Sequence, residues 1–293
     1  MSRKPRAAAV AEEAAPEADR LEGFPHPREA TVLIGQDAAE RELAGALASG
    51  RLHHAWLLAG PEGVGKATLA YRFARAALDA AGGESRLAGL RAPTLDVAPD
   101  SVAARQVRAL SHPGLAVIRR AYDAKGKRFP AAIGVDEVRR LKPFLGLTVA
   151  DGGRRIVIVD RADELNVNAA NALLKSIEEP PPGTVFLLIA SEPGRLLRTI
   201  HSRCRRLDLP ELGIGDLSRA LAHLLAAAGK VPVAPDRLTL LHGLSGGSVR
   251  RALVLASGAG LKLYDRVVAL VGKLPKLDAE AGQKLADELA PAS

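Results

Sequence analysis

Cysteine and aromatic residues are scarce in this chain. Of 293 residues one is a cysteine, Cys204, and phenylalanine, tryptophan and tyrosine together make up 3%. A single cysteine excludes both a disulfide framework and a zinc site built from several thiolates, and it is compatible with a reducing cytoplasm. The shortage of aromatic side chains leaves little material for stacking the bases of single-stranded nucleic acid.

Long apolar runs are also missing. No stretch approaches the roughly 18 apolar residues that a membrane-spanning helix needs, so we expect no contact with a membrane and a cytoplasmic location. The apolar residues 7–11 are too short for a secretion signal and are followed at once by Glu12 and Glu13. We expect residues 1–22, which are rich in alanine, glutamate and proline, to form a disordered tail.

The overall composition is that of an ordinary folded protein. Hydrophobic residues make up 47% of the chain and charged residues 25%, which suffices for a full core in two or three domains. Lysine and arginine exceed aspartate and glutamate by 41 to 33, so the net charge is +8. This excess permits contact with nucleic acid, but over so long a chain it is more typical of a solvated basic surface.

The most informative stretch is residues 60–68, GPEGVGKAT. An apolar run precedes it and a helical pattern follows, in the strand, loop and helix order of a phosphate-binding P-loop. Gly60, Gly63 and Gly65 would allow backbone N–H groups to turn toward phosphate oxygens, and Lys66 would add positive charge. The sequence therefore predicts a nucleotide-binding site for ATP or ADP.

One position of this loop departs from the pattern. Ala67 follows the lysine, where Ser or Thr normally supplies a hydroxyl to Mg²⁺. Thr68 is a candidate nucleotide-binding residue, but one step along a helix turns a side chain by about 100°, so it is no simple replacement. The loop is built to hold phosphates and poorly equipped to place Mg²⁺, and we predict no metal ligand.

A second informative strand ends at Asp160. Residues 154–159 read RRIVIV, an apolar run typical of a strand buried on both faces of a parallel sheet. Its closing carboxylate would emerge at the edge where open α/β sheets place their ligands. Asp160 is therefore the candidate for holding Mg²⁺ through water, the alternative being a carboxylate that caps a helix or loop.

The remaining patterns predict an α/β fold with a parallel sheet, followed from Pro210 by helices alone. We expect strands at residues 52–59, 115–118, 154–160, 185–190 and 207–209. We expect helices at residues 36–48, 66–80, 136–147, 166–179, 215–228, 234–244 and 248–257, and two more after residue 261.

Several segments carry a family resemblance. They are IGQ at 34–36, HHAWL at 53–57, ALLKSIEEPP at 172–181, TIHSRC at 199–204 and GSVRRAL at 247–253. With the P-loop and the acid-ended strand, they make the chain resemble the AAA+ clamp-loader subunits of bacterial DNA polymerase III. The resemblance implies an AAA+ P-loop domain over 23–210, a parallel sheet flanked by helices. A small helical lid over 211–259 and the start of a helical collar, apparently truncated, over 260–293 would follow.

The resemblance also implies roles for single residues. Arg203, within Ser-Arg-Cys, would be an arginine finger that reaches in trans into the ATP site of a neighbouring subunit, where such a group is worth about 10³–10⁵ in rate. Ser191 would sense the γ-phosphate, and Arg250 would be the second sensor on the lid. An ordinary surface arginine is the alternative for Arg203.

Two departures from the family bear on catalysis and zinc. An active member carries Glu directly after the strand-ending aspartate, whereas this chain has Arg161. Together with Ala67, this predicts an ATPase that is weak or inactive, although the loop is still expected to bind nucleotide. Many relatives also carry a four-cysteine zinc module after the P-loop helix, which a chain with Cys204 alone cannot build.

The resemblance finally implies a function and partners. The chain would help load the sliding clamp on primed DNA during DNA replication, within a hetero-pentamer that contains gamma/tau ATPase subunits and a clamp-opening delta subunit. It would have no polymerase activity of its own. Two alternatives stay open: an active clamp-loader ATPase of the gamma/tau type, and a free-standing AAA+ DNA-binding protein.

Overall fold

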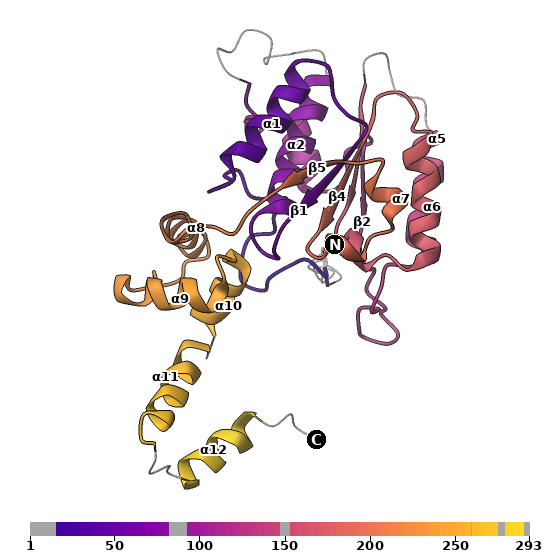
Figure 1. Ribbon diagram of the computed structural model, residues 1–293. Coiled ribbons are helices and arrows are strands. Elements are labelled where there is room, and N and C mark those ends of the chain that lie inside the picture. Colours follow the sequence, from indigo (N-terminus) through magenta and orange to yellow (C-terminus); the bar gives the residue numbers. More distant parts are fainter. Residues whose placement is uncertain (1–15, 82–92, 147–152, 259, 275–278, 290–293) are drawn as a thin grey trace, which may run out of the picture.

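A five-stranded parallel sheet forms the centre of the computed structural model, which describes residues 16–81, 93–146, 153–258, 260–274 and 279–289 (Figure 1). The strands run in the order β2-β3-β4-β1-β5. They are β1 (Ala55–Ala59), β2 (Leu115–Ile118), β3 (Arg155–Val159), β4 (Thr184–Ala190) and β5 (Arg205–Asp208). Because β4 lies between β1 and β3, the loops that follow these three strands meet at one edge of the sheet.

The strands separate two hydrophobic cores. Successive side chains of a strand point to opposite faces, so Ile156 and Ile158 of β3 enter one core while Val157 and Val159 enter the other. Every residue of β1, β3 and β4 is buried. This burial on both faces explains why these strands are continuous apolar runs in the sequence.

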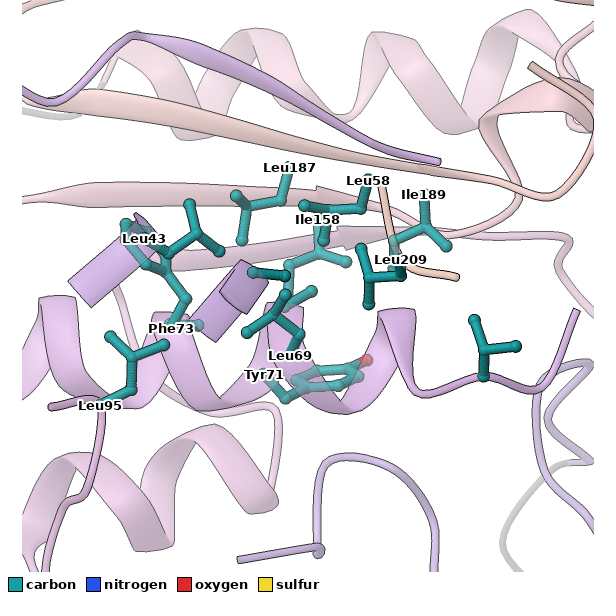
Figure 2. Packing of buried hydrophobic residues seen from close by; sticks show 14 of the residues in the cluster. Leu43, Leu58, Leu69, Tyr71, Phe73, Leu95, Ile158, Leu187, Ile189 and Leu209 are labelled. Carbon is teal, nitrogen blue, oxygen red and sulfur yellow. The ribbon is translucent and has the colours of Figure 1, made fainter. Parts of the chain in front are cut away.

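One face of the sheet is covered by α1 (Asp37–Ala48), α2 (Lys66–Ala81) and α3 (Val102–Arg108). Figure 2 shows Leu69 and Phe73 of α2 packed among strand residues that include Leu58 and Ile158. Burying side chains of this size contributes about 1.5–3 kcal/mol each, so α2 is firmly seated and with it the P-loop at its start. The short helix α3, which Ser101 caps by accepting a hydrogen bond from the Ala104 N–H, is absent from the sequence prediction.

The other face is covered by α4 (Val135–Arg139), α5 (Leu141–Gly146), α6 (Val167–Glu178) and α7 (Arg198–His201). A single helix was expected at 136–147, but the structure has two. Pro143 lacks an N–H, and its ring clashes with the carbonyl four residues earlier, that of Arg139, where α4 ends. The break therefore lies upstream of the proline that causes it.

After β5, the described residues form helices only, as predicted. These are α8 (Ile214–Ala227), α9 (Leu238–Ser245), α10 (Val249–Ser257), α11 (Gly260–Val271) and α12 (Ala279–Leu289), together with a 3₁₀ turn at Pro235–Arg237. In Figure 1, α8 to α10 lie beside the sheet and α11 and α12 extend away from it. Residues 275–278 and 290–293 of the expected collar segment lie outside the described residues. No described helix is long and apolar enough to span a bilayer.

Residues 16–22 differ from the expected disordered tail. Glu17 pairs with Arg28 at 2.7 Å and with Arg119 at 2.5 Å, and Asp19 pairs with Arg119 at 2.9 Å. These partners hold the segment against the α/β domain, and the sequence pattern could not indicate them because Arg119 lies about a hundred positions away. Residues 1–15 of the expected tail lie outside the described residues.

Candidate nucleotide-binding site

The candidate site lies at the carboxyl edge of the sheet, where the P-loop follows β1, Ser191 follows β4 and Asp160 follows β3. A pocket of about 220 Å³ opens there between the P-loop, residues 18–34 and helices α8 and α10. Seven of the eight predicted nucleotide-binding residues line it: Gly63, Gly65, Lys66, Thr68, Asp160, Ser191 and Arg250. The eighth, Gly60, contributes its carbonyl oxygen as an acceptor for Lys66.

Two of the loop glycines are required by close packing as well as by backbone conformation. Gly63 has φ +78°, and a Cβ there would lie 2.6 Å from Cβ of Arg250 and closer still to the Ser248 hydroxyl. A Cβ on Gly60 would overlap the carbonyl oxygen of Leu209, just after β5. The loop that suits phosphate binding is therefore also the contact surface for β5 and α10.

Lys66 is buried, and its amine is bonded within the protein. Nζ donates to the carbonyl oxygens of Gly60 and Pro61, each at 2.5 Å, and to Oγ of Ser191 at 3.1 Å. Burial lowers the pKa of Lys66 to about 8. All three ammonium protons have acceptors, so a phosphate at this lysine must displace at least one of them.

Asp160 and Arg161 lie where the family resemblance places metal-binding and water-orienting acids. Asp160 is buried, and burial raises its pKa to about 7, with the negative charge of Asp19 as a further cause. Arg161 has a left-handed backbone, φ +56°, and its guanidinium pairs with Glu62 at 3.0 Å and with Glu164. The Arg161 guanidinium, bound to Glu62 of the P-loop, therefore lies where the family resemblance places the carboxylate that orients the attacking water.

Asp163 is a positioning residue that the sequence analysis did not assign. It lies in the 3₁₀ turn Ala162–Glu164, and its Oδ2 accepts hydrogen bonds from the backbone N–H of Ser191 at 3.0 Å and of Glu192 at 2.8 Å. The buried carboxylate thereby fixes the end of β4 beside Lys66. An acid three residues after a strand carries no spacing signal for this role, because its partners are main-chain groups of another strand.

Gln36 braces the loop from the other side. Its buried side-chain amide donates to the Val64 carbonyl at 3.1 Å and to the Pro210 carbonyl at 2.9 Å. One side chain at the start of α1 thus connects the P-loop to the segment between β5 and α8. The IGQ segment carried the family resemblance, but its sequence alone did not indicate this contact.

The side chains present do not fit the usual Mg²⁺ shell of a P-loop protein. Ala67 offers no side-chain oxygen; Oδ2 of Asp163 already accepts from two backbone N–H groups, while its buried Oδ1 has no hydrogen-bond partner among the described residues. Within the described ranges no group of three or more His, Cys, Asp or Glu side chains could hold a metal ion. At position 67 the loop therefore lacks the hydroxyl that normally binds Mg²⁺.

Arg250 enters the pocket from α10 of the helical region. Its Nη1 donates to the Asp19 carbonyl at 3.0 Å, and its Nε lies 3.7 Å from Oε1 of Glu62. The adjacent Val249 N–H donates to the Gly63 carbonyl at 2.9 Å. The start of α10 therefore rests directly on the P-loop.

Arg203 lies between α7 and β5 and is not part of the pocket lining. Its guanidinium pairs with Glu178 at 2.7 Å and donates to the Thr199 carbonyl at 3.0 Å, and the side chain is 38% exposed. The neighbouring Cys204 is partly buried, and burial raises the pKa of its thiol to about 12, which makes it an unreactive packing residue. The structure separates Arg203 from the seven residues that the pocket brings together.

This sheet order, the P-loop and the helical region that follows define an α/β P-loop protein of the AAA+ type, as the sequence predicted. A family model described as "DNA polymerase III, delta subunit" matches residues 35–213. The chain is 37% identical over 224 residues to DNA polymerase III subunit delta′ of Pseudomonas aeruginosa, which covers 76% of this chain and 62% of that protein. The chain belongs to the DNA polymerase III delta subunit family.

The chain is also similar to other proteins. DNA polymerase III subunit tau of Escherichia coli is 31% identical over 247 residues, which cover 83% of this chain and 35% of the relative. This chain thus spans less than two thirds of the length of these curated relatives. Among solved structures, a RuvB Holliday junction branch migration motor from Thermotoga maritima is 18% identical, covers 90% of this chain and 74% of that chain, and has a TM-score of 0.46.

Proposed function

We propose that this chain is a delta-prime-type subunit of a bacterial clamp loader, which works in the cytoplasm and helps load the sliding clamp on primed DNA. Family membership and the similarity to a delta′ subunit support the proposal. The partners would be gamma/tau ATPase subunits and a delta subunit in a hetero-pentamer, with clamp and DNA reached through the assembly. Polymerase activity would belong to other subunits.

The observation that carries the proposal is the position of Arg203. It lies outside its own nucleotide pocket, 38% exposed, with the Glu178 carboxylate, the Thr199 carbonyl and the Ser202 hydroxyl as its partners. An exposed ion pair is worth about 0–1 kcal/mol, so a phosphate of a neighbouring subunit can displace Glu178 at little cost. A guanidinium also suits this task because its planar fork binds phosphate oxygens in a bidentate manner.

The chain's own pocket is proposed to bind ATP or ADP without effective hydrolysis. Gly63, Gly65 and Lys66 supply the phosphate contacts, whereas Ala67 supplies no hydroxyl and Arg161 no base. An incoming phosphate would replace carbonyl acceptors at the Lys66 amine, which makes the buried cation more favourable. These two substitutions argue against the alternative of an active gamma/tau-type ATPase.

The other alternative, a free-standing DNA-binding protein, has less support. Arginines near the family segment SRC are matched by carboxylates: Arg205 pairs with Glu42 and Arg206 with Asp208, each at 2.8 Å. A surface neutralised in this way is a poor attractant for a phosphate backbone.

Reconstitution tests the proposed function. This chain is combined with the cognate ATPase and clamp-opening subunits, and clamp loading on primed DNA is measured with and without it. We expect the chain to co-elute with the other subunits in size-exclusion chromatography and loading to depend on its presence. Loading that proceeds equally well without the chain, or failure to co-elute, would contradict the proposal.

A further inference from the structure

The N-terminal residues 17–20, here named the strap, form one wall of the nucleotide pocket. Asp19 lines the pocket together with its neighbours Ala18 and Leu21. The side chains of Glu17 and Asp19 are only 13% and 7% exposed, although both are acidic and lie near the N-terminal end of the chain. Burial of two carboxylates requires partners, and the structure supplies them.

The partners of the strap form a connected set of ion pairs. Arg119 contacts both acids, Glu17 at 2.5 Å and Asp19 at 2.9 Å, and the completely buried His26 lies 2.7 Å from the second oxygen of Asp19. Although burial opposes it, hydrogen bonds from Arg28 and Arg119 hold the pKa of Glu17 at about 2. The strap is therefore seated by several charged contacts at once, unlike a tail that rests on a surface.

These contacts place the Asp19 carboxylate near the phosphate end of the pocket. Arg119 directly follows β2 and Asp160 directly follows β3, and the Asp160 N–H donates to the Ile118 carbonyl at 2.8 Å. The side chain that binds Asp19 thus starts beside the acid that would face the phosphates. The charge of Asp19 is also among the causes that raise the pKa of Asp160, which agrees with this closeness.

The strap also binds Arg250, the arginine that reaches the pocket from α10. Nη1 of Arg250 donates to the Asp19 carbonyl at 3.0 Å, so the guanidinium assigned by resemblance to phosphate sensing is bonded to the chain itself. Arg119, which is not among the residues that line the pocket, binds the carboxylates of Glu17 and Asp19 and so anchors the strap. By contrast, the part of the pocket lined by Phe24, Leu33 and Leu253 is apolar and suited to a nucleoside.

We propose that the strap is an internal competitor for nucleotide phosphates: anchored by Arg119, it places Asp19 in the pocket wall, and its carbonyls bind Arg250 in place of a phosphate chain. The inference rests on the proposal that this pocket accepts a nucleotide. The apolar end would take the nucleoside, while each added phosphate must compete with the strap. The pocket then favours nucleotides with fewer phosphates, and a triphosphate binds well only when the strap leaves.

The test compares the parent protein with the double variant Glu17→Gln, Asp19→Asn, using fluorescent analogues of ATP and ADP. Removing both strap charges weakens its hold on Arg119, so we expect ATP-analogue affinity to rise at least tenfold and ADP-analogue affinity to rise less. Glu22→Gln is the matched control, because Glu22 lies just beyond the strap and is exposed. Adding Lys66→Ala to the double variant should abolish the gain, which places the probe in this pocket.

The outcomes separate the two proposals. Equal affinities of the folded double variant and the parent would overturn the strap as a competitor while leaving the nucleotide pocket intact. Binding by neither protein would overturn both. Should the double variant fail to fold, Asp19→Asn alone is tested, with amide hydrogen exchange of the unmodified protein. Saturating ATP should then lower protection in residues 17–21, and unchanged protection in the nucleotide-bound protein would contradict the inference.

Discussion

The two arginine-bearing regions of this protein differ in how firmly their charges are held. At the pocket, Lys66 is buried and donates to carbonyl oxygens, while Arg161 and Arg250, 35% and 34% exposed, bind Glu62 and the Asp19 carbonyl. At the edge between α7 and β5, Arg203 is 38% exposed; it pairs with Glu178 and donates to the Thr199 carbonyl and the Ser202 hydroxyl. The buried lysine of the pocket is therefore held in fixed contacts, whereas Arg203 at the edge can exchange its partner.

Buried and exposed ion pairs differ in the free energy that is lost when they are broken. Breaking a buried ion pair by removing one partner typically costs about 3–5 kcal/mol, while an exposed pair is worth about 0–1 kcal/mol. Redirecting Arg203 would therefore cost little, whereas removing a partner of the largely buried acids Glu17 and Asp19 would cost more.

The first prediction concerns ATP hydrolysis by the isolated chain. Efficient hydrolysis would show that the pocket is catalytic and would contradict the comparison of the two regions. Because a positioned base alone contributes about 10²–10⁴ in rate, we expect ATP hydrolysis at least a hundredfold below that of a gamma/tau-type subunit. The measurement is phosphate release from both proteins in the same Mg²⁺-containing buffer. Turnover within tenfold of the active subunit would show that Ala67 and Arg161 do not limit the chemistry.

Gly63→Ala should disturb the contact between the P-loop and α10. A Cβ on this positive-φ residue would collide with Ser248 and Arg250, so we expect a loss of about 2–4 kcal/mol in unfolding free energy, measured by urea denaturation. Gly45→Ala in α1 is the control, since nothing lies within 4 Å of its Cβ and alanine should stabilise the helix by about 0.5–1 kcal/mol. Equal effects of the two substitutions would show that the loop is not packed as described.

The substitution Asp160→Asn tests how strongly burial at the pocket disfavours the charged form of this carboxyl group. Burial raises the pKa of Asp160 to about 7. Between about pH 4 and pH 7 the unfolded chain releases this proton while the folded chain retains it. The parent protein therefore loses stability as the pH rises through this range. Asparagine cannot ionise, and above pH 7 we expect the variant to be more stable by about 1–3 kcal/mol. Urea denaturation at pH 5 and pH 8 measures the trend, with the exposed Asp100→Asn as control. A variant advantage that is absent at pH 8 would contradict the assignment.

Arg203→Ala should have the smallest effect on the chain itself. Its ion pair with Glu178 is exposed, so the unfolding free energy is expected to change by less than about 1 kcal/mol. Thermal and urea denaturation of the isolated variant provide the measurement. A loss above 2 kcal/mol would mean that Arg203 supports the fold and is not free to change partners.

Most of the architecture and the pocket could be predicted because their signals are local. The apolar run ending at Asp160 and the glycine spacing before Lys66 each place a residue at the carboxyl edge of a parallel sheet, and the structure brings both to one pocket. Asp163, Gln36 and the strap acids could not be predicted, because their partners lie on segments distant in sequence. Their roles depend on which strand ends become neighbours, which no short pattern encodes.

The stimulated ATPase of the reconstituted assembly tests the central claim most directly. Arg203→Ala is compared with Arg195→Ala, an exposed arginine whose partner Glu192 lies 3.7 Å away, in complexes with the ATPase and clamp-opening subunits, clamp and primed DNA. If Arg203 acts in trans, its loss should lower stimulated turnover at least a hundredfold while the complex still assembles and the Arg195 variant behaves like the parent. Equal turnover of the Arg203 variant, the Arg195 variant and the parent would contradict the account.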